Sequence, residues 1–203
     1  GSGRVVGDAI VHSPKVDGVS FTGSVGVGRQ IAISCVSRQA KVQLEMGGKN
    51  PQVILDDADL KQAVELAVQS AFYSTGQRCT ASSRLIVTAG IHDKFVEAMA
   101  ERMRSIKVGH ALQAGIDIGP VVSRAQLDQD LGYIDIARNE GARLVAGGSL
   151  VTCDTEGYFL APALFADSTA NMRISREEVF GPVANIIKVA DYEAALAMAN
   201  DTE

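Results

Sequence analysis

The chain has 203 residues, of which 46% are hydrophobic and 21% charged, with a formal net charge of −5. These values are typical of soluble globular proteins with a real core, and the negative charge argues against non-specific binding to nucleic acid. No apolar stretch approaches the roughly 18 residues of a membrane span, and the first residues do not form a signal peptide. We therefore expect neither nucleic acid nor a membrane as a partner.

Cysteines and histidines are few and widely spaced. The cysteines are Cys35, Cys79 and Cys153, and the histidines are His12, His92 and His110. An odd number of cysteines without a CxxC pair predicts no disulfide framework and favours a reducing, cytoplasmic location. The histidine spacing predicts no metal site.

Strands and helices alternate along the chain. After a glycine turn at residues 1–7, the apolar pattern predicts strands at 19–22, 41–46 and 52–55, with a helix through Ile31 and Val36 between the first two. Further strands are expected at 85–87, from Leu144 to the glycines at 147–148, at 159–165 and at 183–189, and a helix carrying Phe95, Met99 and Met103 follows the first of these. Such alternation is typical of an α/β fold with a largely parallel sheet.

Capping residues mark the starts of the other helices. Asp59 with Gln62, and Ser123 with Gln126, have the spacing of a capping box. The helix after Asp59 has a wide apolar face and is expected to be buried. Asp191 is placed to cap a last helix that runs to the chain end. Both ends of the chain have the appearance of cuts in a longer polypeptide.

Cys79 is the candidate nucleophile. It follows the buried helix, in residues 76–80 (Gly-Gln-Arg-Cys-Thr). A free thiol has a pKa of about 8.5, and flanking Arg78 or nearby backbone N–H groups would favour the thiolate. A lone cysteine is more often a small buried hydrophobe. Polar neighbours surround Cys79, however, whereas Cys35 and Cys153 show fewer such signs, and this favours the nucleophile.

Glu45 is the candidate general base. It ends a predicted strand directly before Gly47 and Gly48, a pair that indicates a tight turn or a close approach to the backbone. A desolvated carboxylate with a raised pKa at such a point is suited to activating water. The alternative is an ordinary solvent-facing strand residue.

Two further segments are ambiguous. Gly23, Gly26 and Gly28 follow a strand and open a helix, where backbone N–H groups could reach phosphate, but the spacing is not the dinucleotide fingerprint and a plain turn is equally consistent. Residues 177–182 (Glu-Glu-Val-Phe-Gly-Pro) form either an acidic surface segment or a carboxylate that accepts hydrogen bonds from sugar hydroxyls.

Four segments, together and in this order, resemble the aldehyde dehydrogenase superfamily. They are residues 21–24 (Phe-Thr-Gly-Ser), 44–49 (Leu-Glu-Met-Gly-Gly-Lys), 76–80 and 177–182. The resemblance covers nearly the whole chain, although full members are more than twice this length. It implies the end of a Rossmann-like coenzyme domain at 1–47. It also implies, at 48–203, a three-layer α/β catalytic domain with a mostly parallel sheet, incomplete at its C-terminal end.

The resemblance also implies roles for individual residues. Cys79 would attack the aldehyde to give a thiohemiacetal and then a thioester, its peptide N–H would form half of the oxyanion hole, and Glu45 would activate water. NAD or NADP would be the cofactor. The residues implied to bind it are Gly23, Ser24, Gly28, Met46, Glu178 and Phe180.

The surroundings of Cys79, residues 76–84, are similar to those of α-ketoglutaric semialdehyde dehydrogenases, which implies a substrate such as 2,5-dioxopentanoate. The whole protein would be a homo-oligomer acting on a small-molecule aldehyde. One alternative is a CoA-acylating member, against which Glu45 speaks. Another is a non-catalytic folded domain, and we expect no turnover from these residues alone.

Overall fold

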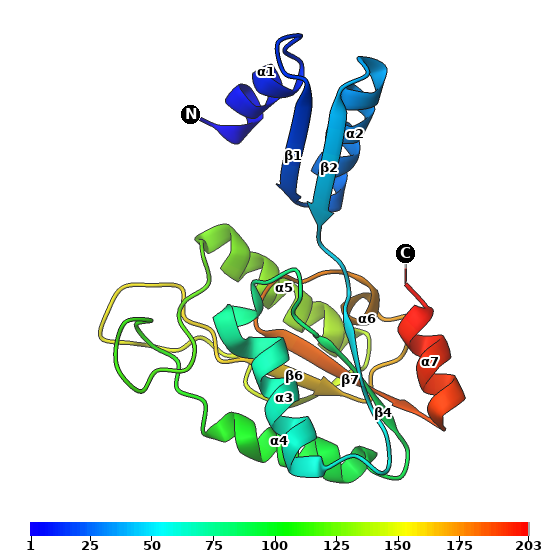
Figure 1. Cartoon of the computed structure of the whole chain (residues 1–203). Helices are drawn as coiled ribbons and strands as arrows, with labels where there is room; N and C mark the ends of the chain where they lie inside the picture. The colour runs from blue at the N-terminus through cyan, green and yellow to red at the C-terminus, as the bar shows by residue number, and fades with distance from the viewer. Residues whose placement is uncertain (203) are drawn as a thin grey trace. The chain divides into compact units, whose positions relative to one another are not determined.

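The computed structural model describes residues 1–202 and forms two compact units, one from Gly1 to Gly47 and one from Gly48 onward. The first unit contains η1 (Gly3–Gly7), α1 (Asp8–Val11), β1 (Gly18–Gly23), α2 (Val25–Ser37) and β2 (Lys41–Met46) (Figure 1). β1 and β2 pair in parallel along their whole lengths, and α2 is the crossover between them. This is a single β–α–β motif preceded by two helical turns.

The helical turns at the start of the chain differ from the expected glycine turn. The N–H groups of Val5 and Val6 both donate to the carbonyl of Ser2, and Gly7 has right-handed helical angles (φ −61°, ψ −44°). Glycine permits a turn without requiring one, so the chain here takes up helix instead.

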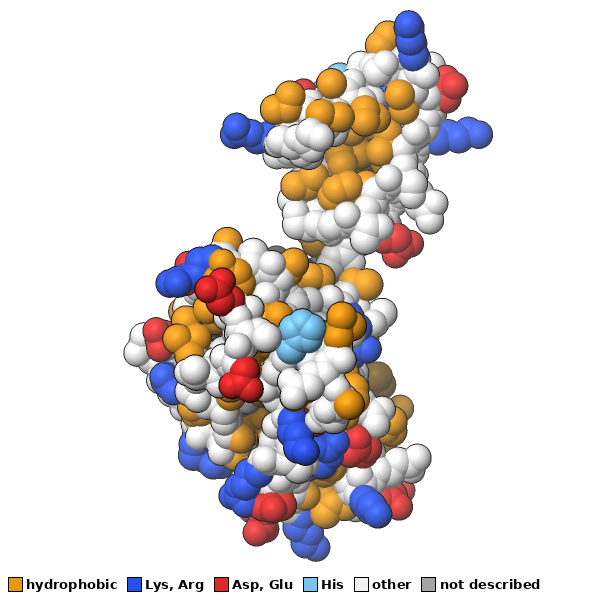
Figure 2. Space-filling view, turned by 90° about the vertical axis from the view of Figure 1, so that its left-hand side faces the viewer, with side chains coloured by type: hydrophobic (Ala, Val, Ile, Leu, Met, Phe, Trp, Pro, Cys, Tyr) orange, Lys and Arg blue, Asp and Glu red, His pale blue; other side chains and the backbone are white. Residues whose placement is uncertain are grey.

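Little of the first unit is buried. Within residues 1–47, all of which the structure describes, Val11 and Cys35 are the buried hydrophobic side chains. Larger apolar residues lie exposed on α1, α2 and the preceding turn, and Figure 2 shows apolar side chains on one face of this unit. A motif of this size has too few residues to enclose a core of its own.

The second unit contains the main sheet. Its elements are β3 (Pro51–Ile54), α3 (Leu60–Phe72), η2 (Tyr73–Gly76), β4 (Arg84–Thr88), α4 (His92–Arg104), α5 (Arg124–Asn139), β5 (Arg143–Ala146), β6 (Ala163–Ala166), α6 (Arg173–Arg176), β7 (Val183–Val189) and α7 (Tyr192–Asn200). The strand order is β3–β4–β7–β6–β5, and all neighbouring strands are parallel except β5 and β6. The expected α/β fold with a mostly parallel sheet is confirmed.

Side-chain alternation along the strands divides the core into two faces. Leu85 and Val87 of β4 pack with residues of α3 and α4, whereas Ile86, between them, packs with Ala195 of α7. Phe165 of β6 packs with residues of α5. The sheet is therefore covered by α3 and α4 on one face and by α5 and α7 on the other, which gives three layers (Figure 1).

The predicted helix starts are confirmed. The Asp59 side chain accepts a hydrogen bond from the N–H of Gln62 at 3.0 Å, and the Ser123 side chain accepts one from Gln126 at 3.2 Å. Asp191 caps α7 in the same way. These caps satisfy N–H groups that have no partner within the helix.

Two later predictions are wrong in their extent. The strand expected at 159–165 begins only at Ala163, because Pro162 has no N–H to donate to the ladder. The last helix ends at Asn200 rather than at the chain end, and the four-residue α6 was not expected. None of the helices within residues 1–202 is long and apolar enough to cross a bilayer.

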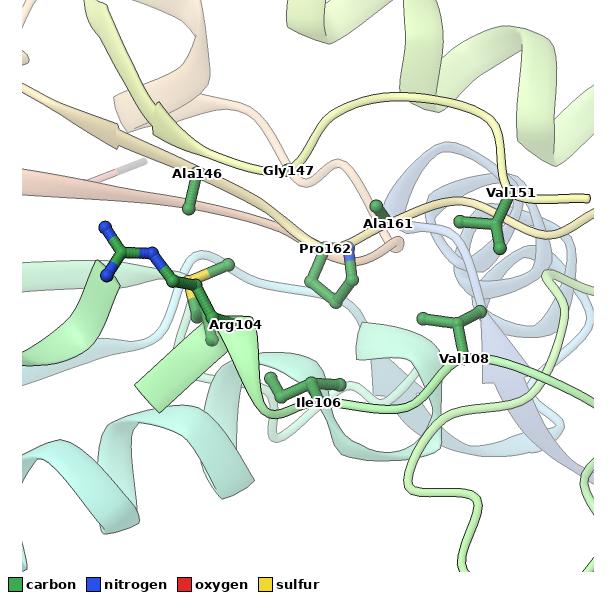
Figure 3. Close-up of a pocket in the computed structure, with 9 residues that line it drawn as sticks. Arg104, Ile106, Val108, Ala146, Gly147, Val151, Ala161 and Pro162 are labelled. Carbon is green, nitrogen blue, oxygen red and sulfur yellow. The ribbon is translucent and has the colours of Figure 1, made fainter. Parts of the chain in front are cut away.

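A hollow of about 280 Å³ lies between the end of α4 and the glycine turn after β5 (Figure 3). Its lining is mainly apolar and comes from Met103, Arg104, Ile106, Val108, Ala146, Gly147, Val151, Ala161 and Pro162. It contains none of the residues that the sequence predicts for catalysis or cofactor binding.

Candidate active site

Cys79 lies in an unusual turn after α3. The chain leaves the helix at Phe72, and Ser74, Thr75 and Gly76 then adopt φ angles of 56°, 58° and 66°. Left-handed angles cost a residue with a Cβ on the order of 1 kcal/mol, so the surrounding contacts must hold this turn. The Cys79 side chain is exposed. Within this chain, the exposure favours the nucleophile over a small buried hydrophobe, and the role of Cys79 stays a prediction.

Side-chain hydrogen bonds of Gln77 and Arg78 hold the turn. The Arg78 guanidinium donates to the carbonyls of Gln69 and Ser70, at 2.8 and 2.9 Å. The side-chain oxygen of Gln77 accepts from the N–H of Val122 at 3.0 Å. The carbonyl of Gln69 also accepts the N–H of Tyr73 at the end of α3. Arg78 therefore adds a second donor there and satisfies the Ser70 carbonyl in the last turn of the helix.

Asn50 fixes the backbone at the candidate nucleophile. Its side-chain amide donates to the carbonyl of Cys79 at 2.5 Å and to that of Ala81 at 3.3 Å. Asn50 immediately precedes β3, so the start of that strand positions the turn. Asn50 was not predicted as a site residue from the sequence. Its place at the end of the segment Gly-Gly-Lys-Asn was the available signal.

The loop that carries Glu178 and Phe180 begins where α6 ends. Glu177 accepts hydrogen bonds from Arg173 at 2.8 Å and from the Tyr133 hydroxyl at 2.5 Å. Arg173 and Tyr133 together keep the pKa of Glu177 below its ordinary value. Glu177 thus anchors the loop, while Glu178 is free of this network.

The Glu178–Phe180 loop and the Cys79 turn are in direct contact. A methyl group placed on Gly76 would lie 2.2 Å from the carbonyl oxygen of Gly181, so only a glycine fits there. A small hollow at this contact is lined by residues of both segments, among them Arg78, Glu178 and Phe180. The structure therefore brings together two segments that the sequence predicted to belong to one site.

Lys49, which was not predicted as a site residue either, is buried beside this hollow. Burial and, to a smaller extent, the nearby charge of Arg84 lower the pKa of Lys49 to about 7, while the carboxylates of Glu178 and Glu177 oppose the shift. Within residues 1–202 its ammonium group has no hydrogen-bond partner. Its position directly after the glycine pair was the signal that could have pointed to it.

The predicted residues of the first unit gather at the ends of its two strands. Glu45 is exposed on β2, opposite Thr22, and Met46 lies opposite Gly23. A methyl group on Gly28 would lie 2.5 Å from the Met46 sulfur, so this glycine allows α2 to pack on the strand. The pairing of Glu45 with Cys79 joins residues of the two units and stays a prediction.

The start of α2 has unpaired N–H groups and open space beside it. Ser24 occupies the N-cap position, but its side chain makes no capping hydrogen bond, so the first N–H groups of the helix remain available. No atom lies within 4 Å of a methyl group placed on Gly26. Free N–H groups at a helix N-terminus with open space beside them suit an anionic ligand.

Comparison with known proteins identifies the family. The aldehyde dehydrogenase family model matches residues 1–203. The chain is 45% identical to an alpha-ketoglutaric semialdehyde dehydrogenase of Bacillus subtilis (strain 168), with 100% of this chain and 42% of that protein covered. It is 41% identical to a 2,5-dioxopentanoate dehydrogenase of Saccharolobus solfataricus, with 98% and 42% covered.

The fold agrees with that of solved relatives. A betaine aldehyde dehydrogenase of Staphylococcus aureus, solved in complex with NAD+, matches with a TM-score of 0.96 at 37% identity, and the match covers 100% of this chain and 41% of that one. The chain spans about 42% of the length of the curated relatives described above. The comparisons and the fold together confirm the resemblance of the four segments, and the chain belongs to the aldehyde dehydrogenase family.

Proposed function

We propose that the whole protein carrying this chain oxidises an aldehyde to a carboxylic acid with NAD+ or NADP+. One observation carries the proposal: the exposed Cys79 follows a strained turn that touches the loop bearing Glu178 and Phe180. A nucleophile held against the segment implied to bind the nicotinamide ribose is the arrangement that this reaction requires.

The proposed chemistry begins and ends at Cys79. Its thiolate adds to the aldehyde carbon, and its peptide N–H donates a hydrogen bond to the oxyanion of the thiohemiacetal. When bound, NAD(P)+ supplies a hydride acceptor for that carbon. Glu45 then takes a proton from a water molecule that attacks the Cys79 thioester, the thiolate departs, and the carboxylic acid is released.

The cofactor would be held by residues of both units. Gly23 at the end of β1, Ser24 at the N-cap of α2 and Gly28 in its first turn would receive the pyrophosphate, with Met46 packed behind Gly28. Glu178 would accept hydrogen bonds from the nicotinamide ribose, and Phe180 would form a wall beside it. The NAD+ complex of the Staphylococcus aureus relative supports this cofactor.

We propose a semialdehyde such as 2,5-dioxopentanoate as the substrate. Two relatives bear the names alpha-ketoglutaric semialdehyde dehydrogenase and 2,5-dioxopentanoate dehydrogenase, and they support this choice. We further propose a homo-oligomer in a reducing cytoplasm. The three free cysteines support the compartment, and light scattering of the whole protein tests the assembly.

A substrate screen of the whole protein tests the proposed function. The semialdehyde, betaine aldehyde and simple aliphatic aldehydes are compared with both cofactors, and acid formation is measured without added CoA. We expect acid from the semialdehyde with the highest kcat/KM. Equal use of the simple aldehydes would contradict the substrate, and a strict requirement for CoA would favour the acylating alternative.

Two substitutions test the assigned roles. Cys79→Ala should lower kcat by about 10⁴-fold or more while cofactor binding survives, and Cys153→Ala, which removes a different thiol, should leave kcat unchanged.

Glu45→Gln should slow thioester release far more than hydride transfer, which would appear as a burst of reduced cofactor. A Glu45→Gln variant as fast as the parent would remove Glu45 from the mechanism.

A further inference from the structure

Asp130 is a buried carboxylate that the proposed mechanism does not use. It lies in the middle of α5, next to the buried Leu127 and Ile134, and is 0% exposed. Its Oδ1 accepts a hydrogen bond from Nε2 of Gln126 at 2.8 Å, and no group within residues 1–202 bonds its Oδ2. Burying a carboxyl group with one unpaired oxygen costs free energy of folding. The contacts that Asp130 makes therefore indicate what it contributes.

The Asp130 carboxyl lies against the α-carbon of Gly181. A methyl group placed on Gly181 would come within 2.1 Å of Oδ1 and 2.5 Å of Oδ2 of Asp130. Two residues earlier, the carbonyl of Val179 accepts the side-chain amides of Gln126 at 3.1 Å and Gln129 at 2.8 Å. α5 therefore holds the segment from Val179 to Gly181 at both of its ends.

The residue between these two anchors shows that the segment is under constraint. Phe180 has a φ of 58°, a left-handed angle that a bulky side chain adopts only where its surroundings impose it. Gly181 then contacts Gly76 at the start of the Cys79 turn. α5 thus contacts the loop of residues 178–181 through Asp130 and Gly181, and that loop contacts the Cys79 turn through Gly181 and Gly76. Close-packed backbone transmits a displacement from one contact to the next.

We propose that Asp130 is a positioning residue. It fixes the position of the loop carrying Glu178 and Phe180 and, through Gly181, the position of that loop relative to the Cys79 turn. This inference rests on the proposed function, because the loop is the part of the chain implied to hold the nicotinamide ribose. Asp130 touches neither the aldehyde nor the reacting atoms in this scheme. Its effect is on the position of groups that do.

The protonation of Asp130 suggests which replacement is conservative. Burial raises the pKa of Asp130 to about 7, and the hydrogen bond from Gln126 opposes this shift. A protonated carboxyl has nearly the shape of a carboxamide, so Asp130→Asn keeps both the packing contact with Gly181 and an oxygen that can accept the hydrogen bond from Gln126. Asp130→Ala removes both.

The experiment uses the whole protein and a double-mutant cycle. The variants are D130A, D130N, G181A and D130A/G181A, with Asp135→Asn as the control because Asp135 lies on the same helix with its side chain 72% exposed. For each variant, the KM for the cofactor and kcat are measured. Hydrogen exchange of the backbone amides at 178–181 is followed by mass spectrometry, with and without NAD+.

We expect D130A and G181A each to raise the cofactor KM about ten-fold with a smaller change in kcat, and to speed exchange in the loop. The D130N and D135N variants should stay within about two-fold of the parent. The D130A/G181A variant should recover toward the parent, because the new methyl group occupies the space left by the carboxyl.

Three results would overturn the positioning role. One is a D130A variant that melts at a lower temperature while its KM and loop exchange are unchanged. Another is a D130N variant as defective as D130A, and the third is a double variant whose losses simply add. A parent protein that oxidises no aldehyde would refute the proposed function instead, and the loop exchange would still decide the role of Asp130.

Discussion

Asp130 and Lys49 are both buried, and burial moves their pKa values toward neutrality from opposite sides, to about 7 in each case. For Asp130 the pKa in the folded chain lies above the ordinary value of 3.8. The folded state then binds more protons than the unfolded state between these values, so the free energy of unfolding falls as the pH rises through that window. For Lys49 the pKa is lowered, and its destabilising effect is relieved as the pH rises above about 7.

The titration of Asp130 predicts a pH-dependent effect of Asp130→Asn. The asparagine cannot ionise, so the variant should gain stability relative to the parent between about pH 5 and about pH 8, by on the order of 1–3 kcal/mol. Urea unfolding of both proteins at the two pH values measures this difference, and Lys49 contributes equally to both. A stability difference that does not change with pH would contradict the assignment.

Arg78 lies beside the candidate nucleophile, but its hydrogen bonds in the structure hold the backbone in place. The sequence suggested that its charge would favour the Cys79 thiolate, whereas the structure has its guanidinium donating to Gln69 and Ser70 at the end of α3. A cation at a helix C-terminus is favourable in itself. The sequence indicated that Arg78 matters near Cys79, but it did not indicate which groups the guanidinium would bind.

At the scale of elements, the turn from Ser74 to Gly76 joins α3 to the candidate nucleophile. Gly76 combines a φ of 66° with the contact to Gly181, so Gly76→Ala should suffer from both backbone strain and a clash. Gly115 is a matched control, because it has a φ of 81° with no atom within 4 Å of an added methyl group.

We expect Gly115→Ala to cost about 1 kcal/mol in the free energy of unfolding, and Gly76→Ala about 3 kcal/mol or more. Chemical denaturation measures both values. The difference between them reports the clash separately from the strain. Equal losses of unfolding free energy in the two variants would mean that the contact between Gly76 and Gly181 contributes nothing to stability.

The elements themselves were largely predictable because their signals are local. The apolar face of α3 and the caps Asp59, Ser123 and Asp191 lie within a few residues of the structure they specify. The start of β6 was misplaced because Pro162 interrupts an apolar run that otherwise reads as one strand. α6, with four residues, is too short to show a period.

For the candidate site, the sequence could suggest residues but not the contacts between them. The polar surroundings of Cys79 indicated its exposure, which the structure confirms. The bond from Asn50 to the Cys79 carbonyl and the seat of Gly181 on Asp130 join residues far apart in the chain. Periodicity and capping carry no information about such pairs, which depend on how the strands are ordered in the sheet.

At the scale of the whole molecule, the hydrophobic clusters lie in residues from Ile54 onward. The unit from Gly1 to Gly47 buries two hydrophobic side chains, Val11 and Cys35. Stability scales with the apolar area that a unit can enclose. The two units should therefore differ sharply when they are produced separately.

A polypeptide of residues 48–203 should fold and unfold cooperatively in urea, whereas one of residues 1–47 should show no cooperative transition. Circular dichroism during denaturation checks both. A cooperative transition in the shorter polypeptide, or its absence in the longer one, would contradict the assignment of the core.

The contact of Gly76 with Gly181 also limits how this part of the chain can vary in sequence. Neither residue presents a side chain at that point, so mutation has nothing there to enlarge, shrink or recharge without breaking the junction. Changes in the hollow at this contact would have to arise at lining positions that do carry side chains, such as Arg78, Glu178 and Phe180. The two glycines would then stay unchanged while the residues around the hollow vary.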